Sequence, residues 1–158
     1  MICEPFETLA AAIPRPGALM GLDLGTETIG VAVSDSFQTV ATPLETIRRK
    51  KFGVDADRLL VIADNRAITG IVLGLPLNMD GSEGPRCQST RAFARNLTAR
   101  TDLPIAFWDE RLSTVAAERA LLEADTTRKR RGEVIDHVAA SYILQGALDR
   151  LAHLGQAT

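Results

Sequence analysis

Apolar runs separated by short turns dominate the first third of the chain. Residues 18–24 and 28–34 are two such runs joined by the tight turn "GTET", which predicts an antiparallel pair of strands. A third strand is predicted over residues 41–47, at an edge of the sheet because Pro43 cannot donate a ladder hydrogen bond. Residues 1–17, which contain Pro14 and Pro16, are predicted to form a loosely packed extension.

The pattern then changes to helices that alternate with strands. Apolar positions at helical spacing predict helices over residues 54–67 and 88–100, and apolar runs predict strands over residues 68–75 and 104–108. Ser113 and Thr114 can cap a further helix, "ADTTRKRRG" is predicted to be a basic loop, and the last helix is predicted from about 134 to 154. This order predicts an α/β fold: a mixed five-stranded sheet flanked by helices, with three antiparallel strands first and parallel β-α-β units after them. We expect one domain over residues 18–158.

Composition limits the function classes. A chain of 158 residues that is 46% hydrophobic and 24% charged is typical of a soluble globular protein. The net charge of −2 argues against a broadly basic nucleic-acid coat, so phosphate contacts would need local patches such as residues 48–51 and 128–131. Each run is equally compatible with a solvated loop. The two distant cysteines, the acidic N-terminus and the lack of a long apolar stretch favour a cytoplasmic protein without zinc or membrane contact.

Asp23 is the most unusual residue, because it is a carboxylate between Leu22 and Leu24 in an apolar strand. Burying it without a partner would cost several kcal/mol, so we expect a ligand or cation beside it. The flanking Gly21 and Gly25 would leave space for that ligand. The alternative is an Asp that caps the turn at the end of the strand.

Two further acidic positions are candidates for the same site. Asp109 and Glu110 end a strand, where ligands of α/β sheets gather, and strand alternation lets only one share a face with Asp23. An acidic helix start is the alternative there. Asp136 lies on the apolar face of the last helix, although it could also cap that helix; His137, one step around, is more readily a surface or hydrogen-bonded residue than a general base. A carboxylate cluster favours Mg²⁺ or Mn²⁺ and is typical of phosphodiester hydrolysis.

Four ordered motifs carry a resemblance to a known family: "GLDLGTETIGVAVSD", "IVLGLPLNMDGSEGPR", "DERLSTVAAE" and "IDHVAASYIL". From about Leu19 to Leu151 the chain resembles the YqgF family, also called RuvX, of pre-16S rRNA nucleases. The resemblance implies a ribonuclease H-like fold and a Mg²⁺-dependent hydrolase that processes the 5′ end of small-subunit ribosomal RNA. The first motif alone also resembles the phosphate-binding hairpins of sugar kinases, Hsp70 chaperones and actin. Those proteins close two lobes over ATP, and this chain is long enough for only one.

The resemblance assigns the catalytic and metal-binding acids as Asp23, Glu110 and Asp136, with Asp109 a weaker candidate. Asp23 would be shared between two Mg²⁺ ions, and the other two acids would hold one each, giving products with a 5′-phosphate. The more distant RuvC-type resolvases carry a further acid three residues after the last one, where this chain has Ala139. A three-acid site can still bind two metal ions if a substrate phosphate serves as a bridging ligand.

Substrate contacts are expected from the turn, the loop and the basic run, namely Arg111, Thr26, Asn78, Arg128, Lys129, Arg130 and Arg131. For Arg111, an ion pair with a neighbouring carboxylate is an equal alternative. Aromatic residues make up 4% of the chain, so structured RNA or branched DNA read by shape fits better than a stacked single strand. One alternative is a Holliday junction resolvase, which would need a homodimer. The other is a non-catalytic ribosome-assembly factor, against which the three retained acids argue.

Overall fold

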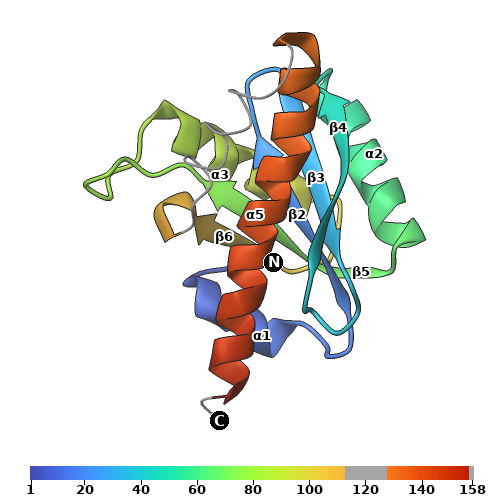
Figure 1. The fold of residues 1–158 in the computed structure, drawn as a ribbon, viewed down its shortest axis with the longest axis vertical. Coiled ribbons are helices and arrows are strands. Elements are labelled where there is room, and N and C mark those ends of the chain that lie inside the picture. Colours follow the sequence, from blue (N-terminus) through green and yellow to red (C-terminus); the bar gives the residue numbers. More distant parts are fainter. Residues whose placement is uncertain (113–127, 157–158) are drawn as a thin grey trace.

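Within the described residues, six strands form one mixed sheet. The computed structural model describes residues 1–112 and 128–156, and the side chains of residues 1–112 and 136–155. The strand order is β1-β6-β5-β2-β3-β4 (Figure 1). The strands are β1 (Ile2–Cys3), β2 (Ala18–Leu24), β3 (Thr28–Ser34), β4 (Ala41–Arg48), β5 (Ile68–Leu75) and β6 (Ile105–Asp109).

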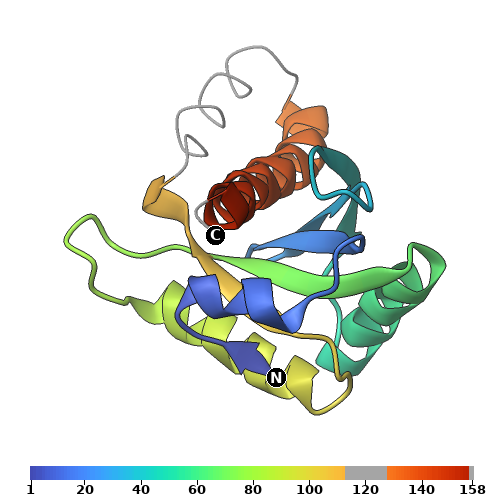
Figure 2. The same cartoon turned by 90° about the horizontal axis from the view of Figure 1, so that it is seen from below.

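Helices cover both faces of the sheet. Helices α2 (Phe52–Asn65) and α3 (Pro85–Thr98) pack on one face, and the long helix α5 (Arg128–Gln156) crosses the other (Figure 2). Alternation along β2 separates the two cores: Met20 and Leu22 pack toward α2 and α3, whereas Leu19 packs toward α5. The shorter helical segments are η1 (Phe6–Thr8), α1 (Leu9–Ala12) and η2 (Glu110–Leu112). None of the helices within the described ranges has the length and apolar character needed to cross a membrane.

Strand pairing confirms the mixed α/β fold predicted from the order of elements. Strands β2, β3 and β4 pair antiparallel, and β5 joins β2 and β6 in parallel after the crossovers through α2 and α3. Strand β4, which contains Pro43, lies at the edge of the sheet as predicted. The cores on both faces are apolar, so the elements that position β2 are fixed by burial on each side.

The N-terminal extension differs from the prediction. Strand β1 pairs in parallel with β6 and adds a sixth strand to the sheet, where five were predicted. Cys3 and Leu9 are buried in the core on the α5 side, and both cysteines of the chain are free thiols. The prediction of loose packing was wrong because these few apolar residues give no periodic signal, yet they cover the open edge of β6.

Helix α5 begins at Arg128, six residues before the predicted start, so the run at residues 128–131 is helical rather than a loop. Arg and Lys are good helix formers, and one internal Gly132 costs only about 1 kcal/mol, which a long helix tolerates. The side chains of Arg128, Lys129, Arg130 and Arg131 lie outside the described ones. The helix predicted after Ser113 also lies outside the described residues.

Candidate active site

Asp23 lies on the central strand β2 and faces helix α5. Its side chain is 5% exposed. Gly21, two residues earlier on the same face, lies so close to α5 that an added Cβ would be 2.7 Å from the Cβ of Leu144. The space predicted at Gly21 is therefore filled by packing. Gly25 forms part of the turn, because its N–H donates to the carbonyl of Thr28 at 2.8 Å.

Two glycines that sequence reasoning missed lie beside Asp23 on the neighbouring strands. Gly30 of β3 is its direct partner in the antiparallel pair. Gly74 of β5 is its neighbour on the other side, since Leu22 is level with Leu73 in the parallel pair. Because Gly30 and Gly74 have no side chains, the sheet surface on both sides of Asp23 carries none from the neighbouring strands.

The other two predicted acids lie over these glycines. A Cβ on Gly30 would collide with the carbonyl oxygen of Asp136, and a Cβ on Gly74 would lie 3.0 Å from Oε1 of Glu110. The order across the sheet is therefore Glu110 above β5, Asp23 on β2 and Asp136 above β3. Three acidic residues from distant parts of the chain therefore lie along one face of the sheet.

Glu110 and Asp109 take opposite sides of β6. Asp109 is level with Leu75, on the face toward α3, whereas Glu110 follows one residue later at the start of η2. Arg111 donates hydrogen bonds to Asp109, with Nη2 at 2.7 Å from Oδ2, and these bonds lower the pKa of the Asp109 carboxyl. The same bonds raise the pKa of the Arg111 guanidinium. The alternative of an ion pair for Arg111 is therefore the arrangement observed.

Asp136 is half-buried in the third turn of α5, so the alternative that it caps the start of this helix was wrong. The hydroxyl of Thr28 donates to its Oδ2 at 2.5 Å, which fixes one carboxylate oxygen. The neighbouring His137 turns toward β4, where its Nδ1 lies 2.9 Å from Oγ1 of Thr46. Thr28 could not be singled out from the sequence, because its link to Asp136 spans 108 residues.

The three acids suit a hard divalent cation in their chemistry, because carboxylate oxygens are the ligands such ions prefer. The side chains are neighbours rather than a closed ligand set: among the described residues, no three His, Cys, Asp or Glu side chains are gathered closely enough to hold an ion. Over Gly74, the Glu110 carboxylate shares the space with the side chain of Ile143 from α5.

The predicted substrate contacts fall in different places. Thr26 is exposed in the turn after β2 and lines a pocket of about 560 Å³. Asn78 holds its own loop together, since its Nδ2 donates to Oγ of Ser82 at 3.0 Å. Arg111 also reaches this loop through the carbonyl of Met79 at 3.3 Å, so it ties the loop to the end of β6.

Comparisons with known proteins cover nearly the whole chain. The family model described as "RuvX: Holliday junction resolvase" matches residues 17–150. Curated relatives named "Putative pre-16S rRNA nuclease" include one from Ruegeria pomeroyi, 76% identical over 98% of this chain and 100% of the relative. Another, from Rhodobacter capsulatus, is 70% identical over 99% of both chains.

Solved structures of RuvC share the fold. RuvC of T. thermophilus in complex with a Holliday junction substrate is 12% identical, has a TM-score of 0.55, and the match covers 87% of this chain and 96% of that one. A second structure, of Thermus thermophilus RuvC, has a TM-score of 0.52 at 14% identity with the same coverage of both chains. At this identity the likeness concerns the arrangement of the sheet and helices.

Proposed function

The chain belongs to the RuvX family of nucleases, and we propose that it is a divalent-metal-dependent nuclease that processes the 5′ end of the pre-16S ribosomal RNA. Its class is hydrolysis of nucleic-acid ester bonds. Relatives that are 70% and 76% identical over nearly their whole length carry the name of a pre-16S rRNA nuclease, which supports RNA as the substrate. The proposed compartment is the cytoplasm, where bacterial precursor rRNA is made.

The observation that carries the proposal is the row of Glu110, Asp23 and Asp136 over glycines. A strand buried on both faces seldom contains a carboxylate, and Asp23 is 5% exposed. Gly30 and Gly74 lie on its two sides; the backbone carbonyl of Asp136 packs over Gly30, and the Glu110 carboxylate packs over Gly74 beside Ile143. Apolar packing alone gives no reason for this convergence of negative charge.

We assign Asp23, Glu110 and Asp136 as the residues that would hold Mg²⁺ or Mn²⁺. When bound, the cation would neutralise phosphate charge and acidify water, the two contributions that metal-dependent phosphodiester hydrolysis requires. Asp23 presents its carboxylate from the rigid centre of the sheet, and the Thr28 hydroxyl orients the Asp136 carboxylate by holding one oxygen. Arg111 ties the loop that carries Met79 to the end of β6.

Cleavage of labelled precursor rRNA by the wild type and by Asp23→Asn, with Mg²⁺, Mn²⁺ or EDTA, tests the assignment. We expect metal-dependent cleavage that leaves a 5′-phosphate, and at least a hundredfold loss in the variant, since metal or electrostatic groups of this kind contribute about 10²–10³-fold. The variant should fold, because asparagine has nearly the same size and shape as the buried aspartate that it replaces.

The matched control is Asp109→Asn, which changes the neighbouring acid of the same "DER" motif on the opposite side of β6. Glu110→Gln should lose cleavage and Asp109→Asn should keep most of it. If Asp23→Asn retains full activity with equal metal, or if Asp109→Asn and Glu110→Gln lose it alike, the assigned site is wrong.

A four-way DNA junction incubated in parallel tests the second candidate. The matched family model, described as a Holliday junction resolvase, favours it. Paired symmetric nicks would favour branched DNA as the substrate and would require a homodimer with two sites. Cutting of the RNA without such nicks would favour rRNA processing.

A further inference from the structure

A pocket lies at the carboxyl end of β2, on the side of the sheet that α3 covers. Its volume is about 560 Å³. Three parts of the chain form its walls: the turn after β2, the segment after β4 and the first half of α3. The lining residues are Leu24, Gly25, Thr26, Arg49, Lys50, Pro85, Arg86, Ser89 and Thr90. Gly25 and Thr26 follow Asp23 within three residues, so the pocket lies at the same end of β2 as the candidate active site, on the side of the sheet toward α3.

The charge of this pocket is positive and uncompensated. Arg49, Lys50 and Arg86 line it, and within the described part of the chain none of them forms an ion pair with a carboxylate. Arginines elsewhere do form such pairs: Arg58, Arg91, Arg100, Arg111 and Arg150. Cations left without a carboxylate in a concave site attract an anion most strongly.

Two of the cations are held in place without losing their charge. Arg49 Nη1 donates to the carbonyl of Gly25 at 2.7 Å, and Arg86 Nη2 donates to the carbonyl of Leu24 at 3.2 Å. The Arg49 guanidinium also lies 5.9 Å from the ring centre of Phe93. A guanidinium has five N–H donors, so both side chains retain donors for a ligand. Holding them in advance reduces the entropy lost on binding.

Neutral donors complete the lining. Thr26 and Ser89 are exposed hydroxyl residues on opposite walls of the pocket. The Thr90 hydroxyl is used within α3, where it donates to the carbonyl of Arg86 at 3.0 Å. A set of cations and hydroxyls without a facing carboxylate matches the phosphodiester group, which is an anion with several acceptor oxygens.

We propose that this pocket binds a backbone phosphate of the nucleic-acid strand whose scissile phosphate lies at the acidic row. The inference rests on the proposed nuclease function, and it names how a protein with a net charge of −2 holds a polyanion near three carboxylates. Such a contact supplies affinity and register along the strand but reads no base.

Binding measured in EDTA tests the pocket separately from cleavage. The probe is a labelled RNA hairpin, and its dissociation constant is measured over a series of salt concentrations. The test variant is the double substitution Lys50→Ala with Arg86→Gln, in which glutamine can still donate to the carbonyl of Leu24. The matched control is Lys51→Ala with Arg95→Gln. Lys51 is next to Lys50 in the sequence and Arg95 lies on α3 with Arg86, but both are exposed and neither lines the pocket.

We expect the test variant to bind the hairpin at least tenfold more weakly than the wild type. The slope of log Kd against log salt concentration should be smaller by about one unit, because one phosphate contact is lost. The control should change the affinity less than threefold. Equal losses in the two variants, or no loss in either, would overturn the proposal. If the wild type binds through the pocket but cleaves neither RNA nor junction, the proposed function fails and the phosphate site stands.

Discussion

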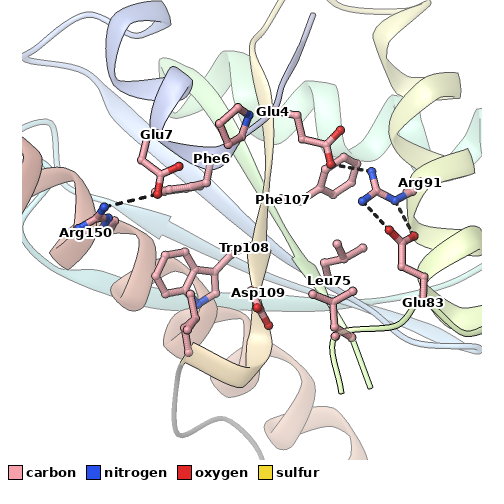
Figure 3. A pocket seen from close by; sticks show the side chains of 14 residues that line it. Glu4, Phe6, Glu7, Leu75, Glu83, Arg91, Phe107, Trp108, Asp109 and Arg150 are labelled. Atoms are coloured by element: carbon pink, nitrogen blue, oxygen red, sulfur yellow. Dashed lines mark hydrogen bonds and ion pairs between the residues drawn. The ribbon is translucent and has the colours of Figure 1, made fainter. Parts of the chain in front are cut away.

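Helix α3 borders two pockets whose arginines have different partners, backbone carbonyls in one pocket and carboxylates in the other. Beside the turn after β2, Arg49 and Arg86 are bonded to backbone carbonyls and keep their charge for a ligand. On the side toward the N-terminal extension, a pocket of about 330 Å³ contains Arg91, which is paired with two acids (Figure 3). An arginine paired with carboxylates thus holds parts of the fold together, whereas an arginine bonded only to backbone carbonyls remains able to bind an anion.

The paired pocket obtains two of its carboxylates from the extension. Arg91 Nη1 lies 2.8 Å from Oε1 of Glu4, and Arg150 Nη2 lies 3.5 Å from Oε1 of Glu7. Arg91 also lies 4.9 Å from the ring centre of Phe107 and bonds Glu83 through Nε at 2.7 Å. These contacts join the N-terminal extension to α3 and α5, so the charged side chains of this pocket hold the extension against the rest of the fold.

Replacing Arg91 with Ala should have the largest effect on stability. The change removes two ion pairs and a contact with an aromatic ring, and we expect the free energy of unfolding to fall by about 1–2 kcal/mol. Urea denaturation measures this loss. Arg95→Ala, an exposed position on the same helix, is the control and should change stability by less than about 0.5 kcal/mol.

The affinity of Arg91→Ala for the RNA hairpin should equal that of the wild type. A weaker affinity with unchanged stability would mean that Arg91 binds substrate as well, and the distinction between the two pockets would be lost. This measurement therefore separates attachment from binding at one residue.

The sequence was sufficient for features that depend on local pattern. The strands around Asp23 were predicted within a residue at each end, because apolar runs and a tight turn are local signals. Asp23 could be chosen from sequence, because a charge inside an apolar strand is visible without a fold. The Arg111 ion pair was one of two predicted alternatives, and its partner Asp109 is only two residues away.

Features that depend on register could not be read from the chain. Gly30 and Gly74 become important only because they lie level with Asp23 on neighbouring strands, and the sequence does not specify that alignment. The contact of Thr28 with Asp136 needs α5 packed across β3. Strand β1 is two residues long, so its pairing with β6 is decided by the open edge and not by propensity.

Ser89→Asp would place a carboxylate in the unpaired pocket and make it resemble the paired one. The new acid can pair with Arg86 and repels phosphate, so we expect RNA affinity to fall about fivefold, roughly 1 kcal/mol. Stability should change by less than about 0.5 kcal/mol, because Ser89 is exposed. The affinity is measured in EDTA at fixed salt.

The control for that substitution is Ser36→Asp, which adds the same charge at an exposed position that does not line the pocket. Its affinity should stay within twofold of the wild type. An equal fall in both variants would indicate that overall charge, rather than a carboxylate in this pocket, governs binding.

The smallest expected effect is a difference in acid sensitivity that belongs to the paired pocket. Hydrogen bonds from Arg91 lower the pKa of Glu83 from its ordinary 4.5, so this carboxylate stabilises the folded state above pH 4.5. Below that pH the unfolded chain takes up a proton first, and the contribution is lost as the pH falls through the folded-state pKa. Urea denaturation of the wild type and Arg91→Ala between pH 6 and about pH 3 measures it. The wild type should lose stability more steeply, so the two curves should approach each other in acid. Parallel curves would show that Arg91 does not hold Glu83 ionised, and the paired pocket would then differ from the other in geometry alone.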